Sequence, residues 1–144
     1  MAPVLAGPQS ASDRMLRYIL APAAERDIEQ ILAWSHEQFG ERARLRYEAL
    51  LVRAVRDVAE DPNRAGSLTR SEIAAGARTY HVRHSRDRVT GEPGRVSRPR
   101  HFLLYRTMPD GEVEIGRVLH DSMDLERHLT DEYRAPTEET DDTI

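Results

Sequence analysis

The chain has 144 residues, 39% of them hydrophobic, which is enough for one domain with a sizeable core and short of two. It has no cysteine, which excludes disulfides, thiolate zinc sites and a cysteine nucleophile. All 21 basic residues are arginine, which excludes chemistry that needs a lysine amine. The net charge is −4, which argues against a dedicated nucleic-acid binder, because the charge of such proteins is usually basic.

Residues 1–14 are rich in Ala, Pro, Ser and Gly, and we expect a flexible leader there. They lack the basic region and the long apolar stretch of a signal peptide. No apolar run in the chain approaches the roughly 18 residues that a membrane span needs, so we expect a cytoplasmic protein without membrane contact. The short apolar run 15–20 is the first predicted strand.

Two helices are predicted next, because apolar residues recur at helical spacing over 23–39 and again over 43–58. Pro22 suits the first turn of the first helix, and Gly40 suits its end. The second helix ends at Asp61-Pro62. Two amphipathic helices joined by about two residues fold back on each other as an antiparallel hairpin.

After a predicted loop over 62–76, the apolar period changes to two, which indicates strands over 78–85, 100–107 and 112–120. Pro109-Asp110-Gly111 is a turn signal between the last two strands. A short helix over 123–129 follows Asp121-Ser122, either of which can cap it. The predicted order is β-α-α-β-β-β-α, an α+β fold in which a small twisted, mostly antiparallel sheet packs on the helical hairpin.

The residues in this order resemble the RelE/ParE toxin superfamily. The motifs that carry the resemblance are the Pro22-Ala-Ala start of the first helix, Phe39-Gly40, Gly76-Ala-Arg78, His101-Phe-Leu-Leu-Tyr-Arg106 and Glu114-Ile-Gly-Arg117-Val-Leu-His120. The Arg-Val-Leu-His ending is typical of the ParE branch. The resemblance covers residues 15–129, which we interpret as the toxin domain, and leaves the leader and residues 130–144 outside it.

The resemblance implies a toxin of a type II toxin–antitoxin pair, held inactive by a cognate antitoxin in a hetero-oligomer. ParE-like members poison DNA gyrase, whereas RelE-like members cut messenger RNA in the ribosomal A site. We therefore predict a growth-inhibiting toxin that binds gyrase. A ribosome-dependent endoribonuclease acting on messenger RNA is the alternative.

The nuclease alternative would use Arg78, Arg83, Arg117 and His120. Arginine holds a phosphate well but stays protonated, so His120 or His81 would have to transfer the proton. For Arg117 the competing role is an ion pair with Glu114, Asp121 or another acid, and for His120 it is orienting a turn. We predict no favoured catalytic residue, no cofactor and no metal site. His81 and His84, three apart on a predicted strand, would face opposite sides and could not bind one ion.

Binding surfaces are the remaining candidates. Target contacts are predicted at Arg78, Arg83, Arg98, Arg100, Arg106 and Arg117, and antitoxin contacts at Trp34, Tyr47 and Leu51. For Trp34 the competing role is a place at the edge of the core. Residues 86–100 hold five arginines and lengthen the hairpin, which makes them either a solvated loop or a contact for phosphates or an acidic protein. Residues 130–144 carry six acids against one arginine and are expected to be a disordered acidic tail.

Overall fold

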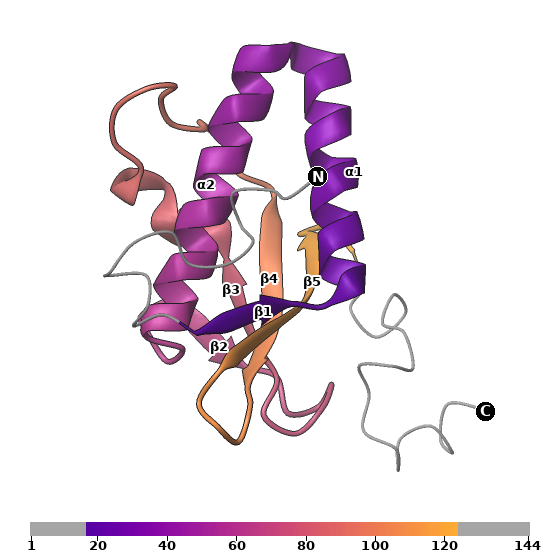
Figure 1. The fold of residues 1–144 in the computed structure, drawn as a ribbon, viewed down its shortest axis with the longest axis vertical. Coiled ribbons are helices and arrows are strands. Elements are labelled where there is room, and N and C mark those ends of the chain that lie inside the picture. Colours follow the sequence, from indigo (N-terminus) through magenta and orange to yellow (C-terminus); the bar gives the residue numbers. More distant parts are fainter. Residues whose placement is uncertain (1–16, 124–144) are drawn as a thin grey trace, which may run out of the picture.

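The computed structural model describes residues 17–123, in which a helical hairpin stands on one face of a sheet (Figure 1). Helix α1 spans Pro22–Phe39 and helix α2 spans Glu41–Glu60, so the predicted hairpin is confirmed. Gly40 alone joins the two helices, with a φ of 93° that glycine adopts without strain. None of the helices formed by the described residues is long and apolar enough to cross a membrane.

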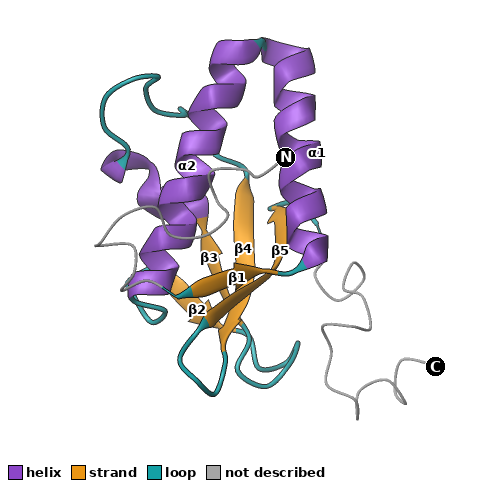
Figure 2. Ribbon diagram, in the orientation of Figure 1, coloured by secondary structure: helices purple, strands orange, loops and turns teal. Residues whose placement is uncertain are grey.

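The sheet has five strands in the order β1-β5-β4-β3-β2 (Figure 2). β1 is parallel to β5, and the other pairs are antiparallel, as expected for an α+β domain with a mostly antiparallel sheet. The strands are β1 (Tyr18–Leu20), β2 (Ser67–Thr69), β3 (Arg78–His81), β4 (His101–Thr107) and β5 (Val113–His120).

Two elements differ from the sequence prediction. Strand β2 lies inside the segment 62–76, which we predicted as a loop. The strand predicted over 78–85 ends at His81, and the chain continues as the 3₁₀-helix η2 (Val82–Arg88). Val82 and Ser85 are both buried, and three residues per turn place them on the same side. The predicted leader, last helix and acidic tail lie outside the described residues.

Both faces of the sheet are covered over much of their area. The main core lies between the helices and the sheet, where Tyr80, Leu103 and Tyr105 meet the buried stripe of α2. On the opposite face, the segment 73–77 packs on Leu104 and Leu119 to form a second, smaller core. Neither face of the sheet is therefore open to solvent over the residues of these two cores.

A buried carboxylate joins α2 to the segment that follows β3. Asp57 of α2 is fully buried, and its side chain accepts hydrogen bonds from Arg53, Ser85 and Arg88. The Ser85 hydroxyl also lies 2.7 Å from that of Tyr80. This contact explains why the chain turns into η2 at Val82, because an extended strand would carry Ser85 away from Asp57.

Candidate functional site

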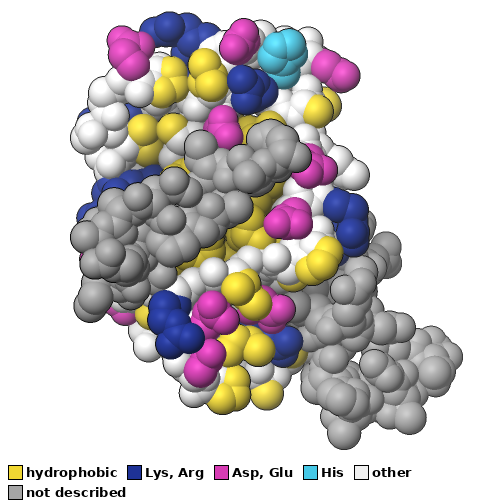
Figure 3. All heavy atoms as spheres, viewed as in Figure 1, with side chains coloured by type: hydrophobic (Ala, Val, Ile, Leu, Met, Phe, Trp, Pro, Cys, Tyr) yellow, Lys and Arg dark blue, Asp and Glu magenta, His cyan; other side chains and the backbone are white. Residues whose placement is uncertain are grey.

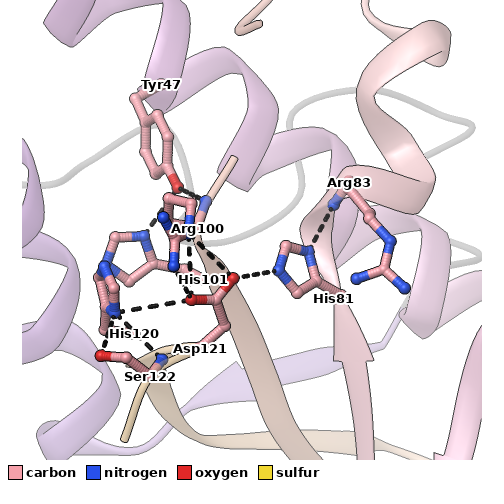
Figure 4. Close-up of polar contacts among 8 residues, drawn as sticks. All are labelled: Tyr47, His81, Arg83, Arg100, His101, His120, Asp121 and Ser122. Carbon is pink, nitrogen blue, oxygen red and sulfur yellow. Dashed lines mark hydrogen bonds and ion pairs between the residues drawn. The ribbon is translucent and has the colours of Figure 1, made fainter. Parts of the chain in front are cut away.

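Polar side chains from four elements converge where β4 begins and β5 ends (Figure 4). The antiparallel register places His101 opposite His120, with the two rings edge to face and their centroids 5.2 Å apart. We call this group the sheet-end cluster, and it comprises Tyr47, His81, Arg100, His101, His120 and Asp121.

The Tyr47 hydroxyl links α2 to the start of β4. It accepts a hydrogen bond from the backbone N–H of Arg100 at 3.0 Å and lies 2.7 Å from Nδ1 of His101. Its own proton can therefore be donated to Nδ1 of His101. Burial, with a smaller contribution from the neighbouring His120, lowers the pKa of His101 to about 4. Burial also raises the pKa of Tyr47 to about 12, so both groups are neutral at pH 7.

This geometry predicts that the protein loses stability as the pH falls from 6.5 to 4. In this window the unfolded chain takes up a proton at the ordinary His pKa of 6.5, whereas folded His101, with a pKa of about 4, does not. The loss should reach about 2 kcal/mol, allowing for the part of the ring that water screens. His101→Asn keeps an acceptor near Nδ1 and does not titrate, so its stability should be flatter with pH in urea unfolding. Equal slopes for the variant and the original chain would contradict this assignment. His84, whose pKa is also lowered by burial, is unchanged in both proteins.

Asp121 fastens the other side of the cluster. Arg100 Nη2 and Nε donate to Asp121 Oδ1 at 2.9 and 3.1 Å, and Nε also lies 3.1 Å from Oδ2. These bonds hold the pKa of Asp121 well below its ordinary value. Nδ1 of His81 accepts the backbone N–H of Arg83, so its proton lies on Nε2 and is donated to Asp121 at 3.0 Å.

His120 orients the turn that follows β5, which is one of the two roles considered from the sequence. Its Nδ1 accepts the backbone N–H of Ser122 at 3.1 Å and lies 2.8 Å from the Ser122 hydroxyl. The three imidazoles of the cluster therefore share one property. Nδ1 of each ring takes part in a hydrogen bond within the protein.

Arg117 forms an ion pair with Asp27 of α1, an acid other than the two named from the sequence. Nε of Arg117 lies 2.7 Å from the Asp27 carboxylate, which also accepts the backbone N–H of Val118 at 2.9 Å. Strand β1 pairs with β5 only as far as Ile115, so Asp27 occupies the edge of β5 beyond that point. Glu114 pairs instead with Arg106 across the β4–β5 ladder, at 3.0 Å.

The predicted arginines do not meet in one site. Arg78 lies at the other end of the sheet, where its Nε donates to the Ser67 hydroxyl at 2.7 Å. Arg83 and Arg98 are exposed, and neither guanidinium has an ion-pair partner within residues 17–123. Figure 4 shows Arg83 on the far side of His81 from Asp121. Sequence reasoning missed Asp27, His101 and Asp121 as members of the site.

The predicted antitoxin contacts also have different environments. Trp34 is 57% exposed and packs edge to face on the exposed Phe39, with centroids 5.6 Å apart, so it does not lie at the core edge. It borders a groove of about 320 Å³ between α1 and the end of β5. Leu51 is fully buried in the main core, which removes it from the surface that a partner can reach. Tyr47 is committed to the sheet-end cluster. Charged side chains of both signs and hydrophobic ones are interspersed over the face of the hairpin (Figure 3).

Metal ligands do not converge in the part of the chain that the structure describes. No group of three or more His, Asp or Glu side chains there is arranged to hold an ion. The geometric reason that we gave for His81 and His84 is wrong, because His84 lies on η2 and not on a strand. His84 packs against the ring of Tyr80, with centroids 5.5 Å apart.

A helical hairpin on a five-stranded mixed sheet is consistent with the small toxins of the RelE/ParE type. A family model described as "ParE toxin of type II toxin-antitoxin system, parDE" matches residues 18–125. Two proteins named Toxin ParE1, from the CDC 1551 / Oshkosh and H37Rv strains of Mycobacterium tuberculosis, are 30% identical over 113 residues, covering 78% of this chain and 97% of theirs. The chain belongs to the ParE toxin family of type II toxin–antitoxin systems, and membership implies an antitoxin partner.

Proposed function

We propose that this toxin inhibits growth by binding DNA gyrase through its surface, that it does not cut RNA, and that a cognate antitoxin neutralises it. The ParE family assignment supports the choice of target, because the ParE branch that the sequence resembles is the one that poisons gyrase. The sheet-end cluster supports the choice of mechanism.

The observation that carries the proposal is that Nδ1 of every imidazole in the cluster is engaged in a hydrogen bond within the protein. A ribonuclease needs a base that can take the proton of the ribose 2′-hydroxyl. Nδ1 of His81 and Nδ1 of His120 each accept a backbone N–H, which leaves a protonated Nε2 that cannot accept, and Nδ1 of His101 is bonded to the Tyr47 hydroxyl. Arginine does not replace them, because it stays protonated at pH 7.

The covered sheet supports the same conclusion. A nucleic acid that lay across the sheet would need its phosphates to meet cations on an open face. On the face away from the helices, residues 73–77 pack on Leu104 and Leu119, and Arg106 and Arg117 are already paired with Glu114 and Asp27. Arg83 and Arg98 are exposed, so they can meet an acidic protein surface.

The experiment is a gyrase assay with purified toxin, scoring loss of supercoiling and accumulation of gyrase-cleaved DNA. We expect the double variant Arg83→Glu/Arg98→Glu to require an about tenfold higher concentration for the same inhibition of gyrase. The reason is that charged residues at the periphery of an interface change the rate of association by modest amounts. Arg26→Glu, an exposed arginine of α1, is the matched control and should match the original chain.

A different outcome would redirect the assignment. If gyrase is unaffected while ribosome-bound messages are cut, and His120→Asn abolishes the cutting without unfolding the protein, the toxin is a ribonuclease. If gyrase is poisoned equally by the original chain and the double-glutamate variant, the target is right and the surface is wrong.

A further inference from the structure

A second groove, of about 670 Å³, lies between α2 and the segment 88–93, away from the sheet-end cluster. One wall is a stripe on α2 formed by Leu45, Ala49 and Val52, which follow one another at helical spacing. The other wall is formed by Val89 and Pro93, within the segment that lengthens the β3–β4 connection. Ala49 and Val52 also pack against the main core, so the apolar stripe that lines this groove borders the core stripe of α2.

The rim of this groove is cationic. It carries four arginines against two glutamates, namely Arg42, Arg53, Arg56 and Arg88 against Glu48 and Glu92. Arg53 and Arg88 share the single carboxylate of Asp57, so two guanidiniums are balanced by one negative charge. Arg42 and Glu92 form an ion pair of 2.9 Å between two largely exposed side chains, which an incoming carboxylate can displace at little cost.

We propose that this groove binds the acidic segment 130–144 of the same chain. An apolar floor with a cationic rim fits a peptide that combines carboxylates with a few large apolar side chains. Residues 130–144 carry six acids, one arginine, Tyr133 and Ile144. The groove and this segment therefore match in both charge and apolar content.

The length of the intervening chain allows the contact. The described residues end at Met123, and about 15 further residues reach Glu138, which span up to roughly 50 Å when extended. A domain of about 100 residues has a radius of gyration of about 13 Å, so the segment can reach any part of its surface. An intramolecular contact also needs only weak affinity, because the linker keeps the local concentration of the segment high. The proposal is independent of the gyrase target.

The absence of cysteine makes a direct test simple. Thr140→Cys in the full chain gives a single site for a nitroxide label, whose effect on amide NMR signals reports proximity. We expect the label to broaden the amides of residues 45–53 and 88–93 selectively. About 0.5 M NaCl, at which the Debye length is roughly 4 Å, should remove most of the broadening.

Two matched substitutions complete the test. Leu45→Glu places a negative charge in the groove at a residue that is 38% exposed, so the fold should survive and the broadening should disappear. Leu68→Glu makes the same change at a 62% exposed leucine on β2 and should leave the broadening intact. Either a failure of the label to broaden these amides, or broadening that persists in Leu45→Glu, would overturn the proposal. So would broadening centred on Arg83 and Arg98, or groove amides that shift only when the antitoxin is added.

Discussion

Asp57→Ala should destabilise the protein by about 3–5 kcal/mol, the cost of breaking a buried ion pair from one side. The carboxylate is fully buried and accepts from Nε of Arg53 and of Arg88 at 3.1 Å each, and from the Ser85 hydroxyl at 2.6 Å. Alanine would leave two guanidiniums and a hydroxyl without their acceptor, and would release η2 from α2. Urea unfolding followed by circular dichroism measures the change.

The matched control is Glu60→Ala, an exposed acid in the last turn of the same helix, which should change the free energy of unfolding by less than about 0.5 kcal/mol. Asp57→Asn retains one oxygen acceptor and should fall between the two. A loss of under about 1 kcal/mol in Asp57→Ala would show that the buried carboxylate does not hold η2 in place.

Asp27→Ala should be about as damaging as Arg117→Ala, each costing about 2–3 kcal/mol. The two side chains are 13% and 17% exposed and lie 2.7 Å apart, and Asp27 also accepts the N–H of Val118. Removing either partner leaves the other charge poorly solvated. Removing Asp27 also leaves the backbone N–H of Val118, at the edge of β5, without its hydrogen-bond acceptor. Thermal and urea unfolding should show both losses, with toxicity reduced in proportion to the unfolded fraction.

This pair separates a structural arginine from a catalytic one. The control is Glu29→Ala, an exposed acid two residues along α1, which should be neutral in both stability and toxicity. If Arg117→Ala abolishes toxicity at unchanged stability while Asp27→Ala remains toxic, Arg117 acts directly on a substrate, and the structural account of the pair fails.

The helical hairpin could be predicted because its two apolar stripes repeat over four to five turns and a single glycine separates them. Strand β2 could not, because three residues are too few to show an alternating pattern. The end of β3 was missed for another reason. The turn into η2 depends on the contact of Ser85 with Asp57, which is 28 residues earlier in the chain and leaves no local signal.

The sheet-end cluster could not be predicted from the sequence, because the pairing of β4 with β5 shifts by one residue part-way along the two strands. The predicted turn at Pro109-Asp110-Gly111 fixes Thr107 opposite Val113, and that register alone would place His101 opposite Leu119. A bulge at Gly116 shifts the pairing by one residue and brings His101 against His120. Similarly, the Asp27–Arg117 pair depends on how α1 crosses the edge of β5 beyond the end of β1, which the sequence does not show.

Leu51 illustrates a limit of patterns on a helix with two apolar stripes. Residues of both stripes on α2 repeat at helical spacing, and only the packing shows that Leu51 faces the sheet while Leu45 faces the second groove. The role of each predicted arginine could not be decided from the sequence either. Whether an arginine is paired within the protein or available to a partner depends on which acidic residues the fold brings near it.

We propose that this toxin acts by binding gyrase and not by cutting messages. The most direct measurement is induced expression in a bacterial host with and without the antitoxin gene, scoring growth, gyrase-linked DNA breaks and message integrity in the same culture. We predict arrest with DNA breaks and intact early messages, relieved by the antitoxin and retained by His120→Asn. Rapid message cleavage without DNA breaks, lost in His120→Asn, would contradict the account.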